Sequence, residues 1–147
     1  MYSDMISRQA CLRLGTALIF AMSALGSYST IAAAADIKVT LTGDQEVPSV
    51  KGAGNGTGTI IIGADKSVSG SVKTTGIAGT AAHIHEAAPG KNGPVVIPLT
   101  KNGDTYAVPA GAKLSDAQFA SFKAGNLYVN AHTAANPDGE IRGQLKP

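Results

Sequence analysis

The stretch Asn126-Leu127-Tyr128-Val129-Asn130-Ala131-His132 alternates apolar and polar side chains. In an extended strand, successive side chains point to opposite faces. The apolar members of the stretch therefore share one face, and its polar members, which end with His132, share the other. This pattern predicts a β-strand whose apolar face belongs to a core.

Similar runs recur along the chain at spacings of about ten residues, separated by turns that contain glycine. They occupy residues 37–41, 58–62, 67–74, 81–85, 94–99, 105–108, 126–132 and 140–145. Many short strands at regular spacing are typical of antiparallel β-sandwiches and barrels. We therefore predict an all-β fold of one of these two kinds.

One segment, which begins at Ser115, departs from the strand pattern. Ser115 and Gln118 have the spacing of a capping box, in which each side chain bonds the backbone N–H of the other residue. Phe119 and Phe122 fall on one face of a helix, and Gly125 suits its end. The sequence therefore predicts one short helix that packs two phenylalanines onto the sheet.

The first 35 residues differ in composition from the rest of the chain. Arg8 and Arg13 precede an apolar run over residues 14–25, and an alanine tract closes the segment. This order of parts predicts a cleaved signal peptide over residues 1–35 and export to a periplasm or beyond. An uncleaved membrane anchor is disfavoured because the apolar run is shorter than the roughly 20 residues that a span needs.

The expected mature domain, residues 36–147, contains no sulfur. The single cysteine and all three methionines lie in the leader, and the chain has no tryptophan. A disulfide and metal ligation by sulfur are therefore excluded from the mature domain. The net charge of the whole chain is only +2. Charge thus gives no reason to expect nucleic acid or, after cleavage, a membrane as a partner.

All three histidines of the chain fall in two short segments. His83 and His85 are two residues apart in an expected strand, so both imidazoles face one way and Ile84 faces the other. His132 comes from the polar face of another expected strand. Three neutral imidazoles are typical ligands of copper and zinc in sites that leave one position open. We therefore hypothesise a copper or zinc site made of these three histidines.

Other side chains near the histidines are candidates for supporting roles. Glu86 follows His85 directly and is a candidate accessory ligand in place of water. Asn130 and Glu140 could each accept an N–H from a ligating ring and fix its tautomer. Arg142 could act beside them, but for Glu140 and Arg142 we expect a cross-strand or solvent-exposed charge pair rather than a role at the site.

Several of these motifs occur in an order that resembles one known family. They are Leu41-Thr42-Gly43-Asp44-Gln45-Glu46-Val47-Pro48, His83-Ile84-His85 with residues 89–96, and residues 125–133 with 139–145. Together they resemble the CHRD domain, named from chordin and found also in many secreted bacterial proteins. The resemblance implies an immunoglobulin-like β-sandwich but no defined reaction. Family members usually carry a small residue after the second histidine, so Glu86 is either a bystander or an added ligand.

A looser resemblance is to copper-zinc superoxide dismutase, which is also an all-β protein. That enzyme carries a His-x-His strand, a distant histidine ligand and an arginine in a late glycine-rich segment. His83, His85, His132 and Arg142 could take those roles. The zinc-binding loop, the disulfide and several further histidines of the enzyme have no counterpart in this sequence.

Three functions remain open from the sequence. The first is a secreted domain that binds copper or zinc. The second is a non-catalytic extracellular module with an unknown protein partner, in which the histidines merely form a polar strand face. The third is a copper enzyme of the superoxide dismutase type. We expect a binding module rather than an enzyme, and no residue is assigned a catalytic role, because the chain has no nucleophile motif such as Gly-x-Ser-x-Gly.

Overall fold

The computed structural model describes residues 34–147. The predicted signal peptide falls almost wholly on residues 1–33, which lie outside the described part. The first strand begins at Ala35, the last residue that the sequence assigned to the leader. Within residues 34–147, no helix is long and apolar enough to cross a membrane.

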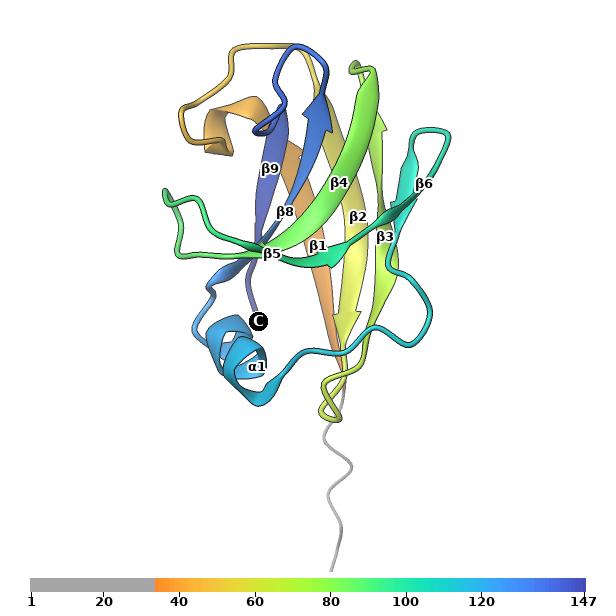
Figure 1. Cartoon of the computed structure of the whole chain (residues 1–147), viewed down its shortest axis with the longest axis vertical. Coiled ribbons are helices and arrows are strands. Elements are labelled where there is room, and N and C mark those ends of the chain that lie inside the picture. Colours follow the sequence, from red (N-terminus) through yellow and green to blue (C-terminus); the bar gives the residue numbers. More distant parts are fainter. Residues whose placement is uncertain (1–33) are drawn as a thin grey trace, which may run out of the picture. The chain divides into compact units, whose positions relative to one another are not determined.

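The described residues form nine strands, one short 3-10 helix and one α-helix (Figure 1). All the paired strands are antiparallel, as predicted. The elements are β1 (Ala35–Thr42), η1 (Gly43–Gln45), β2 (Asn55–Ile62), β3 (Val68–Thr75), β4 (Gly79–Glu86), β5 (Val95–Pro98), β6 (Thr100–Asn102), β7 (Thr105–Ala107), α1 (Asp116–Lys123), β8 (Leu127–Thr133) and β9 (Ile141–Leu145).

The nine strands make one sheet in the order β5-β4-β8-β9-β1-β2-β3-β7-β6. Only Leu99 separates β5 from β6, so one segment pairs with β4 through β5 and with β7 through β6. The Leu99 N–H also donates to the Ala82 carbonyl of β4, at 3.0 Å. The sheet therefore curves into a nearly closed barrel (Figure 1), which is the second of the two predicted architectures.

Alternate apolar residues fill the barrel. In β1, Ile37, Val39 and Leu41 are buried, whereas Lys38 and Thr40 between them are exposed. In β8, the apolar members of the predicted strand face belong to the same core, as expected. Alternation of this kind turns one face of each strand inward and contributes roughly 1.5–3 kcal/mol for each large aliphatic side chain that is removed from water.

The helix α1 lies at one end of the barrel (Figure 1). Ser115 caps it, and both hydrogen bonds of the predicted capping box with Gln118 are present. Phe122 is buried and Phe119 packs partly buried against the core, with 6.1 Å between the two ring centroids. Gly125 follows the helix with a φ of +75°, which a glycine adopts without strain. The sequence prediction for this helix is confirmed.

The outer face of β4, β8 and β9 is also covered. All seven residues of β8 are buried, including those on its polar face. Loops contact this face from three parts of the chain, residues 43–54, 87–94 and 134–140. A layer of polar side chains therefore lies between the barrel wall and these loops, and the three histidines belong to it.

Candidate metal centre

The register of β4 and β8 brings the histidines to one place on the barrel wall. His83 is paired with Asn130, His85 with Tyr128, and Ala81 with His132. His132 is thus the diagonal neighbour of His83 on the adjacent strand, and the side chains of such neighbours lie within reach of each other. Two strands supply all three imidazoles, as the sequence predicted.

The three histidines form a compact cluster. One ring nitrogen from each residue lies within 4.8 Å of those of the other two. His83 Nδ1 and His132 Nε2 are the closest pair, 2.9 Å apart. Two nitrogens bound to one zinc ion at tetrahedral angles are about 3.3 Å apart. These two nitrogens would therefore have to separate only slightly to share an ion.

Backbone carbonyls orient two of the rings. His85 Nδ1 lies 2.9 Å from the Gly93 oxygen, and His132 Nδ1 lies 2.9 Å from the Pro137 oxygen. Because a carbonyl only accepts, each Nδ1 must carry the proton, and each Nε2 keeps its lone pair. The Nε2 of His85 is buried and has no hydrogen-bond partner among the described residues. An unpaired buried nitrogen of this kind fits a metal ligand.

The surroundings keep the three imidazoles neutral. Burial lowers the pKa of all three below the ordinary histidine value. His132 and His85 lower the pKa of His83 further, and His132 and Arg142 lower that of His85. The hydrogen bonds to Gly93 and Pro137 act in the opposite direction without reversing the shifts. Neutral imidazole is the form that binds metals.

Glu86 lies away from the cluster. As the next residue of β4 after His85, it points to the other face of the strand. Its carboxylate accepts a hydrogen bond of 2.5 Å from the Ser121 hydroxyl of α1. The structure therefore joins Glu86 to the helix and does not bring it together with the histidines as an accessory ligand.

Glu140 also lies away from the rings, although the sequence made it a candidate partner. Its carboxylate accepts hydrogen bonds from the Thr133 hydroxyl at 2.8 Å and from the Asn136 amide at 2.5 Å. These bonds close the turn between β8 and β9. Glu140 forms no ion pair with Arg142, and Arg142 is buried, so the charge pair that the sequence predicted for these two residues is wrong.

Asn130 and Arg142 lie inside the polar layer. The Asn130 amide donates to the Asp138 carbonyl at 3.3 Å, and the side chain also acts on the pKa of His85. Arg142 is 1% exposed and lies over the ring of Tyr128, with 3.4 Å between its guanidinium carbon and the ring centroid. Both residues thus lie beside the cluster, whereas the ring N–H groups of His85 and His132 bind backbone oxygens.

Sequence reasoning missed two further members of this layer. Tyr128 stacks on His85, and its hydroxyl accepts from the Gly93 N–H at 3.3 Å. Glu46 is 6% exposed, and burial raises its pKa to about 7. Tyr128 was visible as a polar-face residue of its strand. No pattern in the sequence near Glu46 indicates that it is buried, because it follows η1 and is covered by loops that are distant in sequence.

Comparison with known proteins identifies the family but not a close relative. No curated protein and no solved structure matches the chain. The comparisons do not bear out the looser likeness to copper-zinc superoxide dismutase or a bacterial source. The family model of the CHRD domain, which is in general an extracellular module, matches residues 37–145. That match spans most of the chain and all nine strands except the first two residues of β1. The chain therefore belongs to the CHRD domain family.

Proposed function

We propose that this CHRD domain is an extracellular module that binds one copper or zinc ion through His83, His85 and His132. The observation that carries the proposal is the convergence of three imidazoles, one of which has a buried Nε2 without a partner. Backbone carbonyls already fix the orientation of two rings. A site built in this way loses little conformational entropy when it binds an ion.

The donor set limits the choice of metal. Imidazole nitrogens favour copper and zinc, whereas calcium and magnesium require several oxygen ligands. For first-row divalent ions at a nitrogen site, Cu(II) binds more tightly than Zn(II). We therefore expect the order Cu(II), then Zn(II), with no measurable affinity for Ca²⁺. Three protein ligands leave a fourth position for water.

Binding also sets the tautomer of His83. In the hydrogen bond to His132, His83 Nδ1 must be the donor, because His132 Nδ1 already donates to Pro137. His83 can act as a ligand through Nδ1 only when its proton has moved to Nε2. This shift keeps the ring neutral, so binding near pH 7 should release little acid.

The test is calorimetric titration of the purified, untagged protein with Cu(II), Zn(II) and Ca²⁺, beside the triple variant His83→Ala, His85→Ala, His132→Ala. Lys38→Ala is the matched control, because Lys38 is exposed on β1. We expect stoichiometric Cu(II) and Zn(II) binding that the triple variant loses and the control keeps. Absence of binding to the wild-type protein would refute the metal site and leave the alternative of a non-catalytic interaction module.

We propose, in addition, that residues 1–35 direct export and are then removed. The proposal rests on the order of basic residues, apolar run and small residues in this segment. Intact mass measurement of the secreted protein tests it, and we expect a chain that begins close to Asp36. Retention of the full-length mass in the secreted fraction would contradict cleavage.

A further inference from the structure

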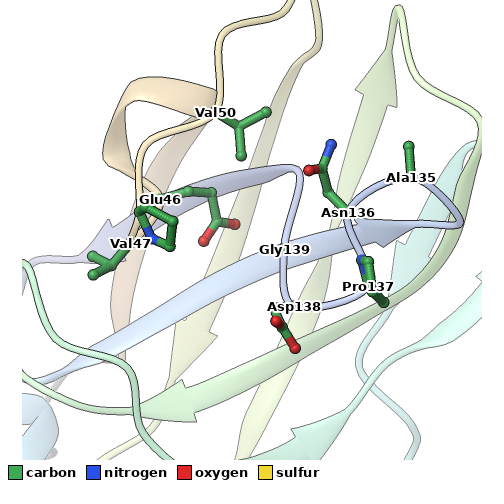
Figure 2. A pocket seen from close by; sticks show the side chains of 9 residues that line it. Glu46, Val47, Val50, Ala135, Asn136, Pro137, Asp138 and Gly139 are labelled. Carbon is green, nitrogen blue, oxygen red and sulfur yellow. The ribbon is translucent and has the colours of Figure 1, made fainter.

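A cavity of about 250 Å³ lies between the loop that follows β1 and the turn between β8 and β9 (Figure 2). Its walls come from both segments and combine aliphatic side chains with polar groups. The aliphatic residues are Val47, Pro48, Val50, Ala135 and Pro137, and the polar side chains are those of Glu46, Asn136 and Asp138. Ligand pockets for whole small molecules usually measure about 300–1,000 Å³. This cavity is smaller, and its size suits a single side chain.

The carboxylate of Glu46 faces the space between these two segments (Figure 2). Glu46 is 6% exposed, and its Oε1 has no hydrogen-bond partner among the described residues. The carboxylate packs against the backbone of Gly139, where any side chain would collide with it. A buried carboxylate oxygen without a partner is costly. Glu46 Oε1 is thus a buried acceptor without a hydrogen bond, on a residue that lines this pocket.

Arg142 does not pair with the Glu46 carboxylate. It forms no ion pair within 4.0 Å of Glu46, and its guanidinium donates instead to Asn92, Ala88 and Gln144 at 3.3–3.5 Å. Arg142 lines a separate cavity on the other side of Glu46. No lysine or arginine is among the described residues that line the pocket between the two segments.

The chemistry of the pocket selects its ligand. Calcium needs six to eight oxygen ligands, whereas Glu46, Asn136 and Asp138 are the only described residues lining the pocket whose side chains carry oxygen. A quaternary ammonium group is typically held by aromatic rings, and none of the described residues lining the pocket is aromatic. A primary ammonium on an aliphatic stem suits both the aliphatic side chains and the carboxylate of the pocket. Its methylene groups contact the aliphatic side chains, and its N–H groups reach the carboxylate. Asp138, exposed on the rim, adds negative charge at the entrance.

We propose that this pocket, with Glu46 as its acceptor, binds the side chain of a lysine presented by a partner protein. The proposal is independent of the metal site. Its parts are a buried carboxylate, aliphatic side chains that line the same pocket, and a second, exposed carboxylate on Asp138.

The test uses metal-free protein in EDTA at pH 8, where Glu46 is ionised, with binding followed through the backbone amide NMR signals of Val47 and Gly139. The probe is Nα-acetyl-lysine N-methylamide, and the matched ligand is Nα-acetyl-norleucine N-methylamide, which has the same stem without the ammonium group. Glu46→Gln removes the charge at nearly constant shape. Asp44→Asn is the matched control, because Asp44 is exposed on the same loop and lines only the other cavity.

We expect saturable binding of the lysine probe with a Kd on the order of millimolar, since one side chain makes few contacts. Glu46→Gln should weaken it about tenfold or more, as expected for loss of a charge-assisted hydrogen bond, whereas Asp44→Asn should not. Equal binding of the norleucine probe, or full affinity in a folded Glu46→Gln variant, would overturn the proposal. So would binding of butylammonium as tight as that of the lysine probe, which would assign the pocket to free amines.

Discussion

The imidazole of His85 stacks on the ring of Tyr128, with 4.9 Å between the centroids and 8° between the planes. The guanidinium of Arg142 also lies over the Tyr128 ring. Because β8 lies between β4 and β9, Tyr128 separates the imidazole from the guanidinium. Tyr128 therefore fixes the plane of one candidate ligand and keeps a buried cation away from it.

This stacking leads to a prediction for Tyr128. Tyr128→Leu removes the ring that orients His85, so it should lower Cu(II) affinity about 10–100-fold, as other losses of ligand support do. Tyr128→Phe keeps the ring and loses only the hydrogen bond from the Gly93 N–H. It should bind Cu(II) nearly as the wild type does. Calorimetric titration of both variants checks this, and equal losses in the two would rule out a role for stacking.

His83, the least buried member of the cluster, gives the cleanest test of the ligand set. His83→Ala should lower metal affinity by more than about 100-fold, because one of three ligands is lost. His83 is only partly buried and its loss should leave the barrel intact, so the far-ultraviolet circular dichroism should not change. Wild-type metal affinity in this variant would disprove the three-histidine site.

Much of this fold could be predicted from the alternation of apolar and polar residues along the strands. The two faces of β8 and the capped helix followed from local sequence, because a strand or cap depends on near neighbours. Closure of the barrel could not be predicted from local sequence. It depends on Leu99, which joins two short strands into one segment that pairs on both sides. No local pattern marks that event.

The candidate site, like the fold, could be predicted from the sequence only in part. Spacing placed His83 and His85 on one face, and the polar face of β8 placed His132 toward them. The ring partners could not be predicted, since they are the carbonyls of Gly93 and Pro137 and backbone carries no side-chain signal. Nearness in sequence also misdirected the prediction for Glu86, because one step along a strand reverses the face.

Glu86→Gln tests that last point. The carboxylate accepts from Ser121 on the helix, so the variant should keep wild-type metal affinity. It should lose a small amount of stability, about 0.5–1.5 kcal/mol, through a weakened hydrogen bond. Titration with Zn(II) and urea denaturation measure the two effects. A clear fall in Zn(II) affinity with unchanged stability would instead make Glu86 an accessory ligand.

Gly139 connects the metal site with the lysine pocket. Its φ is +146°, and a side chain there would collide with the Glu46 carboxylate. Gly139→Ala should destabilise the protein by about 1–3 kcal/mol. It should also weaken metal binding, since the same turn carries the Pro137 carbonyl that holds His132.

Gly103→Ala is the control for that variant, because Gly103 also has a positive φ, +61°, but a side chain there would meet no atom of residues 34–147 within 4 Å. It should cost stability through backbone strain alone and leave metal affinity unchanged. The two variants are compared by urea denaturation and calorimetric titration. Equal behaviour of both would show that contact with Glu46 does not matter.

The raised pKa of Glu46 predicts how stability depends on pH. The unfolded carboxyl loses its proton near pH 4.5, whereas the folded one keeps it to about pH 7, because burial outweighs the lowering effects of Arg142, Asn130 and Val47 on this pKa. Between these values the folded state binds more protons than the unfolded state. This contribution is therefore fully present below pH 4.5 and is lost as the pH rises to about 7. The histidines act oppositely, since their lowered pKa values cost stability as the pH falls below 6.5.

Glu46→Gln isolates the carboxyl, because the histidines contribute equally to both proteins. Its stability relative to the wild type should rise by about 1–3 kcal/mol between pH 4.5 and pH 7.5, since one pKa unit corresponds to about 1.4 kcal/mol. Urea denaturation of both metal-free proteins across this range measures the difference. A difference that stays constant with pH would show that Glu46 titrates alike in the folded and unfolded chains, and that its buried oxygen finds a partner when the carboxylate ionises.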